Sequence, residues 1–326
     1  MMPAVTAVLT SHALLGATEP ISVFRAIVLG VLQGITELFP VSSLGHTVLF
    51  PTLFGWHSLV VAQSKPESFW LAFVVMLHVG SAVGLLIYFW RDWVEIIRAF
   101  FRTLAKRRIE TSTERLAWLL IAASIPTGII GILLEHQVRT ALAKPTAAAV
   151  FLVINGFILI AAERLRRRPQ VRALARQGGT VARAAETDEI LPGVPGRPME
   201  SLSYREAAGI GVLQSTALIA GISRDGVCMM GGLLRGLDNE HAAKFAFLLA
   251  TPIILAAGLF KFPDLTGPLG AVPGVRRAAV IAAVAAAVAA VICVHFLMRY
   301  FRRNNLIPFG LYCIAFGTAM IIYTVA

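Results

Sequence analysis

The sequence predicts an all-α polytopic membrane protein, built as an inverted-topology repeat of two halves. Each half is expected to hold a broken or re-entrant helical motif followed by three transmembrane helices. Three observations lead to this fold class: the composition, the distribution of basic residues and a doubled motif. Of the 326 residues 57% are hydrophobic and only 14% are charged, whereas about 25% of the residues in a soluble domain are charged. The chain is therefore expected in a lipid bilayer.

Six apolar stretches are long enough to cross a bilayer, which takes about 20 mostly apolar residues per helix. Residues 1–20 precede them and lack the basic start and continuous apolar core of a cleavable signal, so we expect an N-terminal extension. The three cysteines are widely spaced and are expected to be packing residues. The six predicted spans are 69–90, 116–134, 146–162, 245–260, 278–298 and 306–326.

Basic residues gather in three of the connections between these spans. Residues 91–115 hold seven of them, residues 164–205 hold nine arginines, and residues 299–303 hold three. This clustering is the positive-inside pattern and places the three connections in the cytoplasm. The net charge of +11 is thus explained by topology and by contact with anionic membrane lipids, and we expect no nucleic-acid partner.

The same assignment fixes the direction of every span. The first three spans run inward, outward and inward, and the last three run outward, inward and outward, so the second triplet is the first one inverted. We therefore divide the chain into an extension (1–20), a first half (21–163), a cytoplasmic linker (164–205) and a second half (206–326). The linker is rich in Arg, Gly and Pro, which favours a connection without a packed core.

A doubled motif precedes each triplet. Residues 30–45 read GVLQGITELFPVSSLG and residues 211–226, 181 positions later, read GVLQSTALIAGISRDG, with six of 16 aligned positions identical. Pro40 ends the first helix, and Ser42 and Ser43 supply turn and N-cap chemistry. Gly221 takes the place of Pro40 in the second copy. Because inverted repeats form their sites where such breaks meet, the two copies are expected to face each other.

The first copy, residues 30–46, carries a carboxylate and a histidine. Gln33 and Glu37 share one helix face, and a carboxylate within an apolar segment is costly and indicates function. An interfacial glutamate near a helix end is the alternative. His46 follows the break and has a carboxylate and two hydroxyls nearby in sequence, which favours function over a packed histidine.

The second copy carries Ser223 and Arg224 between Gly221 and Gly226. A guanidinium matches a pair of phosphate oxygens, and free N–H groups at a helix start cradle anions. The alternative is that Arg224 merely pairs with Glu37 or with its neighbour Asp225. Together the two copies suit phosphoryl transfer, in which positioning and charge stabilisation dominate, with a divalent cation such as Mg²⁺ recruited by the carboxylate.

At these residues the sequence resembles the undecaprenyl-diphosphate phosphatase family, the bacitracin-resistance type of integral membrane lipid phosphatase. GVLQGITELFPVSSLGH is similar to the family's first signature and GISRDG to its second. Further similarity runs through SIPTGIIGILL, GGLLRGLDNEHAAKFAFLLATPIILAAG and FLMRYFRRNNLIPFGLYCIAFG. The resemblance covers nearly the whole chain except residues 1–20 and the linker.

The resemblance implies hydrolysis of a polyprenyl diphosphate lipid to the monophosphate at the outer face of the bacterial plasma (inner) membrane. That reaction recycles the carrier lipid for cell-wall peptidoglycan synthesis and gives bacitracin resistance, with a divalent cation, Mg²⁺ or Ca²⁺, as cofactor. A homodimer is left open. The implied site residues are Glu37, His46, Arg224 and Ser42 as catalytic residues, Ser43, Ser223, Arg224, Gly221, Gly226 and Gln33 as substrate-binding residues, and Glu37 as metal ligand.

Three departures from the family pattern affect this assignment of site residues. Gln33 lacks the charge that some members have in a second glutamate, Leu44 replaces a common hydroxyl residue, and Asp225 replaces the usual serine after the arginine. The sequence leaves open whether His46 is a nucleophile or a base. It also leaves a carrier-lipid phosphate transporter as the alternative function, because inverted repeats are a transporter architecture.

Other residues are expected to have structural roles. His78 is expected to pack or hydrogen-bond within the bundle, and Asn155 with Gly156 is expected to mark a close helix contact. The alanine-rich run 278–291 is suited to close helix packing. His136, His241 and His295 lie near span ends and carry no signal of a partner.

Overall fold

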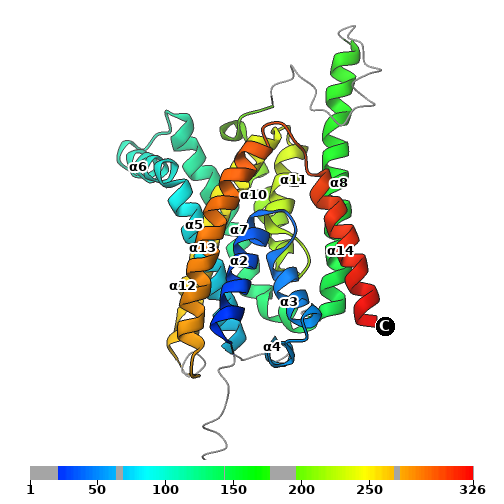
Figure 1. The fold of residues 1–326 in the computed structure, drawn as a ribbon. Coiled ribbons are helices and arrows are strands. Elements are labelled where there is room, and N and C mark those ends of the chain that lie inside the picture. The colour runs from blue at the N-terminus through cyan, green and yellow to red at the C-terminus, as the bar shows by residue number, and fades with distance from the viewer. Residues whose placement is uncertain (1–20, 64–68, 143, 177–195, 268–271, 326) are drawn as a thin grey trace, which may run out of the picture.

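A computed structural model describes residues 21–63, 69–142, 144–176, 196–267 and 272–325 (Figure 1). The predicted extension, 1–20, lies outside them. The described residues are helical, with no strand beyond an isolated bridge between Arg197 and Leu237, which confirms the all-α class. The first half contains α2 (Val23–Leu38), α3 (Ser43–Leu53), α4 (His57–Gln63), α5 (Phe69–Tyr88), α6 (Trp90–Lys106), α7 (Ser112–Leu142) and α8 (Pro145–Arg176). The second half contains α10 (Tyr204–Gln214), α11 (Arg224–Leu234), α12 (Asn239–Thr266), α13 (Val275–Tyr300) and α14 (Ile307–Val325), with short 3₁₀ turns at Met199–Ser201 and Ser215–Leu218.

The membrane spans agree with the six predicted stretches. Five helices are long and apolar enough to cross a membrane, and α5 with α6 forms a sixth candidate that is bent by 84°. Several helices extend beyond the predicted stretches, and the largest difference is at α8, which runs past the predicted end of its span, at 162, to Arg176. The added residues are mostly Arg, Leu and Ala, which are good helix formers. The predicted linker therefore begins as helix, and its part from 177 to 195 lies outside the described residues.

The two motif copies fold alike at the offset of 181 residues. The helices α2 and α10 begin at equivalent positions, and α3 and α11 coincide over their whole length. Serine caps all four helices: Ser22, Ser42, Ser203 and Ser223 each accept a hydrogen bond from the backbone N–H three residues on, which is the N-cap arrangement. The doubled sequence thus encodes a doubled local structure.

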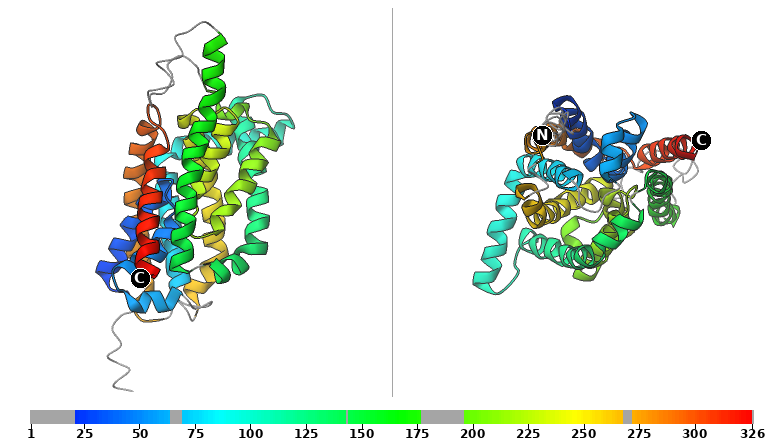
Figure 2. Two further views of the ribbon diagram at one scale, coloured as in Figure 1. Left: turned by 90° about the vertical axis from the view of Figure 1, so that its right-hand side faces the viewer. Right: turned by 90° about the horizontal axis from the view of Figure 1, so that it is seen from below.

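The two halves also pack reciprocally through small residues. A Cβ added at Gly30 of α2 would lie 2.3 Å from the carbonyl oxygen of Ala282 in α13, and one added at Gly211 of α10 would lie 2.0 Å from that of Ala123 in α7. Gly30 and Gly211 are equivalent motif positions. The contact at Ala282 confirms that the alanine-rich run serves close helix packing. The third long helices, α8 and α14, lie side by side (Figure 2).

The broken motifs approach each other from different ends of the bundle. In Figure 1 α2 and α3 occupy the lower part and α10 and α11 the upper part. The described parts of the three basic connections lie at the upper end, where α6, the end of α8 and the α13–α14 connection are found. The start of α12 is held at the same end, because Arg302 Nε lies 2.9 Å from Glu240 Oε1. The breaks therefore meet inside the bundle.

The glycine contacts give a stability prediction. Changing Gly211 to Ala should lower thermal stability, because the new methyl group meets the Ala123 backbone, and overpacking of this kind costs about 1–3 kcal/mol. Gly209 lies in the same helix with nothing within 4 Å of its added Cβ, so Gly209→Ala should be neutral or stabilising by up to about 1 kcal/mol. Melting curves of both variants in detergent test this. Equal melting temperatures would contradict it.

Candidate functional site

The first break is held by the hydroxyl of Ser42. Its Oγ accepts hydrogen bonds from Gly45 N–H (3.2 Å) and from Gly221 N–H of the second copy (3.1 Å). Ser42 has φ 69°, a left-handed conformation that costs a non-glycine residue free energy unless its surroundings enforce it. The two accepted bonds supply that enforcement and tie the first break directly to the second.

The second break is held from α8 by Asn155. Its Nδ2 donates to the Pro40 carbonyl oxygen (3.0 Å), and its Oδ1 accepts from Ser223 N–H (2.9 Å). One buried amide therefore satisfies a backbone group of each break. The neighbouring Gly156 confirms the predicted close helix contact, since a Cβ there would lie 2.5 Å from the Gly310 carbonyl oxygen. The bridging role of Asn155 was not predicted.

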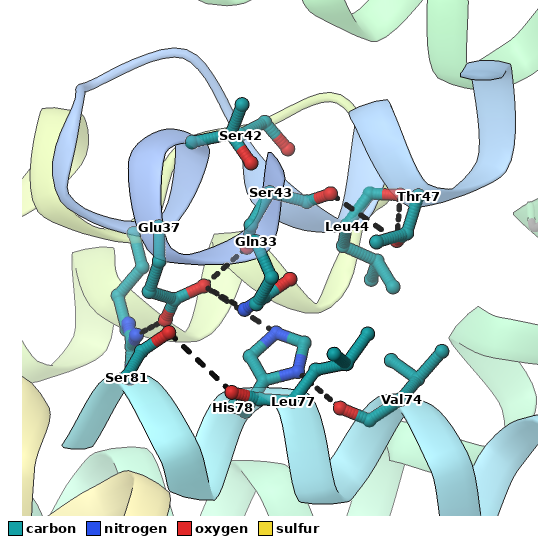
Figure 3. A network of polar contacts seen from close by, with 12 residues as sticks. Gln33, Glu37, Ser42, Ser43, Leu44, Thr47, Val74, Leu77, His78 and Ser81 are labelled. Atoms are coloured by element: carbon teal, nitrogen blue, oxygen red, sulfur yellow. Dashed lines mark hydrogen bonds and ion pairs between the residues drawn. The ribbon is translucent and has the colours of Figure 1, made fainter. Parts of the chain in front are cut away.

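The Glu37 carboxylate, at the end of α2, is the point where the polar groups converge (Figure 3). Its Oε2 accepts from Gln33 Nε2 at 2.9 Å and from the Ser43 hydroxyl. Its Oε1 accepts from Arg224 Nη2 across the two halves. Gln33 is fully buried, and its Oε1 has no hydrogen-bond partner among the described residues. Glu37 is thus a buried carboxylate surrounded by donors, not an interfacial glutamate.

Arg224 and Ser43 are equivalent positions, since each is the first residue of its helix after the break. The Arg224 side chain is 15% exposed, so it lies at the rim of the site while it reaches Glu37. Its Nε is 4.0 Å from Asp225 Oδ1. Asp225 is fully buried, and in the part of the chain that the structure describes neither of its carboxylate oxygens has a hydrogen-bond partner. Arg224 therefore pairs with Glu37 and lies near Asp225, as the alternative interpretation of the sequence expected, and its side chain is still partly exposed at the site.

His46 lies in an aromatic pocket. Its Nδ1 is 2.7 Å from the Ser42 carbonyl oxygen, and its Nε2 is 2.8 Å from the Tyr312 hydroxyl. The ring stacks on Tyr312 and Phe316 of α14. Because both ring nitrogens have partners, and neither partner is Glu37, the structure places His46 beside the break rather than against the carboxylate.

His78 is the site residue that the sequence did not single out. Its Nε2 lies 3.4 Å from Glu37 Oε2, and its Nδ1 is 2.8 Å from the Val74 carbonyl oxygen. Figure 3 shows the ring reaching from α5 toward the carboxylate. The expected hydrogen bond within the bundle is present, yet the side chain is 24% exposed and touches the central group. Its position inside an apolar span was the signal, because intramembrane titratable residues indicate function.

The remaining predicted substrate-binding residues form the turn of the second break. Gly221 donates its N–H to Ser42 and has φ 105°, a conformation that favours glycine. Gly226 donates its N–H to Ser223 Oγ at 3.1 Å. These contacts position the start of α11. Leu44, at the first break, packs against the apolar core. Substrate contacts by Ser223, Gly221 and Gly226 stay predictions.

The arrangement can bind and attack an anion. A serine hydroxyl rests on a carboxylate, a guanidinium is next to it, and two helices begin at the same place. The first turn of a helix leaves N–H groups without intrahelical partners, and the helix dipole adds partial positive charge. A phosphate group placed between Ser43 and Arg224 would meet donors on several sides, with a hydroxyl available for attack.

Comparison with known proteins places the chain in a sequence family. A family model described as bacitracin resistance protein BacA matches residues 26–319. Undecaprenyl-diphosphatase 2 of Frankia alni is 48% identical, covering 90% of this chain and 95% of the relative. Undecaprenyl-diphosphatase of Mycolicibacterium paratuberculosis is 46% identical (94% and 98%). The protein of that name from Acidiphilium cryptum is 40% identical (91% and 96%).

The Asn155 bridge gives a second stability prediction. Asn155→Leu leaves the Pro40 carbonyl and the Ser223 N–H buried without partners, and each unsatisfied group costs about 1–3 kcal/mol. We expect a large drop in melting temperature. Thr251→Val is the matched control, because the buried Thr251 hydroxyl donates to the Phe247 carbonyl of its own helix. If both variants melt alike in detergent, Asn155 does not hold the breaks.

Proposed function

The chain belongs to the bacitracin resistance protein BacA family, and on this premise we propose that it is an undecaprenyl-diphosphatase. It hydrolyses undecaprenyl diphosphate to the monophosphate and inorganic phosphate, which returns the carrier lipid to cell-wall synthesis. The observation that carries this proposal is the Glu37 carboxylate, which accepts from a serine hydroxyl and a guanidinium supplied by different halves. This combination suits phosphoryl transfer, in which positioned donors and one base supply most of the catalysis.

Arg224 is the group that binds the diphosphate in this proposal. A guanidinium presents paired donors to phosphate oxygens, and Arg224 is the partly exposed member of its pair with the buried Glu37. An arriving diphosphate takes Arg224 away from Glu37 and leaves one carboxylate oxygen free. The starts of α3 and α11 add N–H groups around the same phosphate. Substrate binding therefore frees the base.

Ser43 is the nucleophile that the geometry favours. Its hydroxyl already donates to Glu37, which fits a general base that takes the proton as Ser43 Oγ attacks the terminal phosphorus. The bridging P–O bond breaks, and undecaprenyl monophosphate leaves with the bond electrons. The departing monophosphate takes the proton from Glu37. A water molecule then attacks the phosphoserine and gives its proton to Glu37, which passes it to Ser43 Oγ as the serine–phosphate bond breaks and inorganic phosphate departs.

Ser42 and His46 have positioning roles in this mechanism. The Ser42 hydroxyl is engaged as acceptor by two backbone N–H groups, so it holds the start of α3 where Ser43 needs to be. His46 is held between the Ser42 carbonyl and the Tyr312 hydroxyl and fixes the same turn. His78 contacts the Glu37 carboxylate from α5 and restricts its orientation. The sequence-based assignment of His46 as nucleophile or base remains the competing proposal.

The divalent cation, Mg²⁺ or Ca²⁺, belongs to the proposal as a partner of the substrate. Among the described residues no group of three or more His, Cys, Asp or Glu side chains could hold a metal ion. The oxygens that fit a hard cation are those of Glu37 and the unpartnered Gln33 Oε1, so water and phosphate oxygens would complete the shell. Such a cation would neutralise charge on the phosphate oxygens. These few protein oxygens fit a cation that would arrive bound to the diphosphate.

The proposed location is the bacterial plasma membrane, with the site opening to the outer face. The described parts of the basic connections lie at the upper end in Figure 1, and the positive-inside rule assigns that end to the cytoplasm. The helices α2 and α3, which carry Glu37 and Ser43, lie toward the opposite end.

The inverted relation of the two halves is part of this proposal and is supported by the equal motif helices and the reciprocal glycine contacts. A homodimer stays a prediction.

A carrier-lipid transporter is not favoured. The relatives quoted above are named for a phosphatase, and a transporter would need Arg224 for recognition but no base in contact with a hydroxyl. Phosphate release from farnesyl diphosphate by purified protein therefore separates the two functions.

The first kinetic prediction concerns Glu37 and Arg224. Glu37→Gln should lower kcat for phosphate release by about 10²–10⁴-fold, because the base is lost while the hydrogen bonds can persist. Arg224→Lys should raise KM and lower kcat, because an ammonium lacks the planar paired donors. Arg205→Lys is a matched control at an exposed arginine in the first turn of α10. Undiminished release by Glu37→Gln would refute the base assignment, and no release by the wild type would refute the enzyme.

The second kinetic prediction separates Ser43 from His46. Rapid quenching of labelled substrate turnover should trap a phosphoserine that is stable in acid, and Ser43→Ala should abolish it. Ser42→Ala should retain a trapped phosphoserine, although with lower yield, since its hydroxyl positions the turn. An acid-labile phosphohistidine that disappears in His46→Gln would establish the competing assignment instead.

The third kinetic prediction concerns the cation. A chelator should abolish phosphate release, and added Mg²⁺ or Ca²⁺ should restore it. Gln33→Glu adds a charged ligand beside Glu37 and should lower the cation concentration for half-maximal activity by about tenfold, which is about 1.4 kcal/mol. Full activity in chelator would show that Arg224 and the helix starts neutralise the diphosphate without a cation.

A further inference from the structure

The helix α6 turns away from the membrane-crossing direction. It follows α5 after the single residue Phe89 and is bent by 84° from it. In Figure 1 it lies beside the upper end of the bundle, and the view from below in Figure 2 shows it at the edge of the molecule. Because α5 is a predicted span, a helix nearly perpendicular to it runs close to the plane of the membrane.

The surface of α6 has three distinct faces. A narrow face formed by Ile96, Ala99 and Thr103 is buried, and the indole Nε1 of Trp118 in α7 donates to the Thr103 hydroxyl at 2.9 Å. A second face is apolar and exposed. It consists of Trp90, Ile97, Phe101 and Leu104, which are 49–62% exposed. Spacings of three, four and seven residues put these four side chains on one side of a helix.

The third face is basic. Arg91, Arg98 and Arg102 are spaced by seven and four residues and are all exposed, so they share a side of the helix that differs from the apolar face. Between residues 90 and 108 six basic residues stand against two acidic ones. One of the acidic residues, Asp92, is paired with Lys244 of α12 at 2.6 Å. Arg91 and Arg98 form no ion pair with any described residue.

Trp90 and Arg91 mark the corner between the spanning helix and α6. The Arg91 guanidinium lies over the Trp90 ring, 5.3 Å from its centroid, and Trp90 is 56% exposed. Tryptophan is enriched at the boundary between headgroups and acyl chains. The corner is therefore at the depth where a helix lying in the membrane plane would meet the headgroups.

We propose that α6 is an interfacial helix that binds the anionic lipid surface of the cytoplasmic leaflet. Its apolar face, Trp90, Ile97, Phe101 and Leu104, inserts among the upper acyl chains, and its basic face binds phosphate headgroups. Amphipathic helices with a basic side bind anionic membranes in this way. An exposed apolar face on a membrane protein otherwise needs a protein partner, and the neighbouring basic face matches a lipid phosphate surface. The proposal does not depend on the phosphatase activity.

The first part of the test measures depth. Single-cysteine variants Phe101→Cys and Arg98→Cys are labelled with an environment-sensitive fluorophore in the full chain, in nanodiscs of equal parts phosphatidylcholine and phosphatidylglycerol. The unmutated chain, whose three cysteines are buried, gives the background. Val284→Cys, 60% exposed in the middle of α13, is the hydrocarbon reference. We expect the label at Phe101 to be quenched by lipids with a nitroxide on the acyl chain, and iodide to quench the label at Arg98 several-fold more strongly.

The second part measures charge. The double variant Arg91→Gln, Arg98→Gln should retain several-fold less phosphatidylglycerol after detergent purification than the wild type, as counted by native mass spectrometry, while the label at Phe101 keeps its depth. Equal iodide quenching at both positions would place α6 in water and overturn the proposal. Protection of the Phe101 label that disappears at one protein per nanodisc would identify a second copy as the occupant. Unchanged lipid retention by the double variant would overturn the role of the basic face.

Discussion

Glu37 and Arg224 come from different halves of the chain, and the rest of the site is organised around their ion pair. A buried carboxylate needs donors, because leaving it unpaired costs several kcal/mol. Glu37 meets this requirement with Gln33, Ser43 and Arg224. Two of these donors also act in the proposed reaction, since Arg224 binds the diphosphate and Ser43 attacks it. The proposed chemistry therefore uses groups that also make the buried charge tolerable.

Holding that pair in place requires two helix breaks to meet inside an apolar bundle. Backbone groups at a break must find partners there, since no bulk water is present. Ser42 and Asn155 provide them by bonding to both breaks. Because Gly30 and Gly211 have no side chain, the helices that lead into the breaks, α2 and α10, can approach α13 and α7 closely. Thus the same duplicated segment supplies the approach, the caps and the chemistry.

Local patterns in the sequence predicted much of this arrangement. Apolar length gave the spans, Pro40 and Ser42 gave the first break, and the repeated motif gave the pairing of the copies. The contact of His78 with Glu37 and the bridge that Asn155 makes between the breaks were missed, because they depend on how α5 and α8 pack against the breaks, which no local spacing encodes. The different contacts of Ser42 and Ser43 follow from one left-handed backbone angle at Ser42, and sequence alone does not reveal which hydroxyl faces Glu37.

The coupling between Glu37 and Arg224 is measurable as a double-mutant cycle. The free energy of unfolding is determined for the wild type, Glu37→Gln, Arg224→Gln and the double variant in mixed micelles titrated with denaturing detergent. A direct pair across the halves predicts that the double variant is less destabilised than the two single changes add up to, by roughly 1–3 kcal/mol. Additive effects within about 0.5 kcal/mol would show that the two side chains are not coupled and would contradict an ion pair at the centre of the fold.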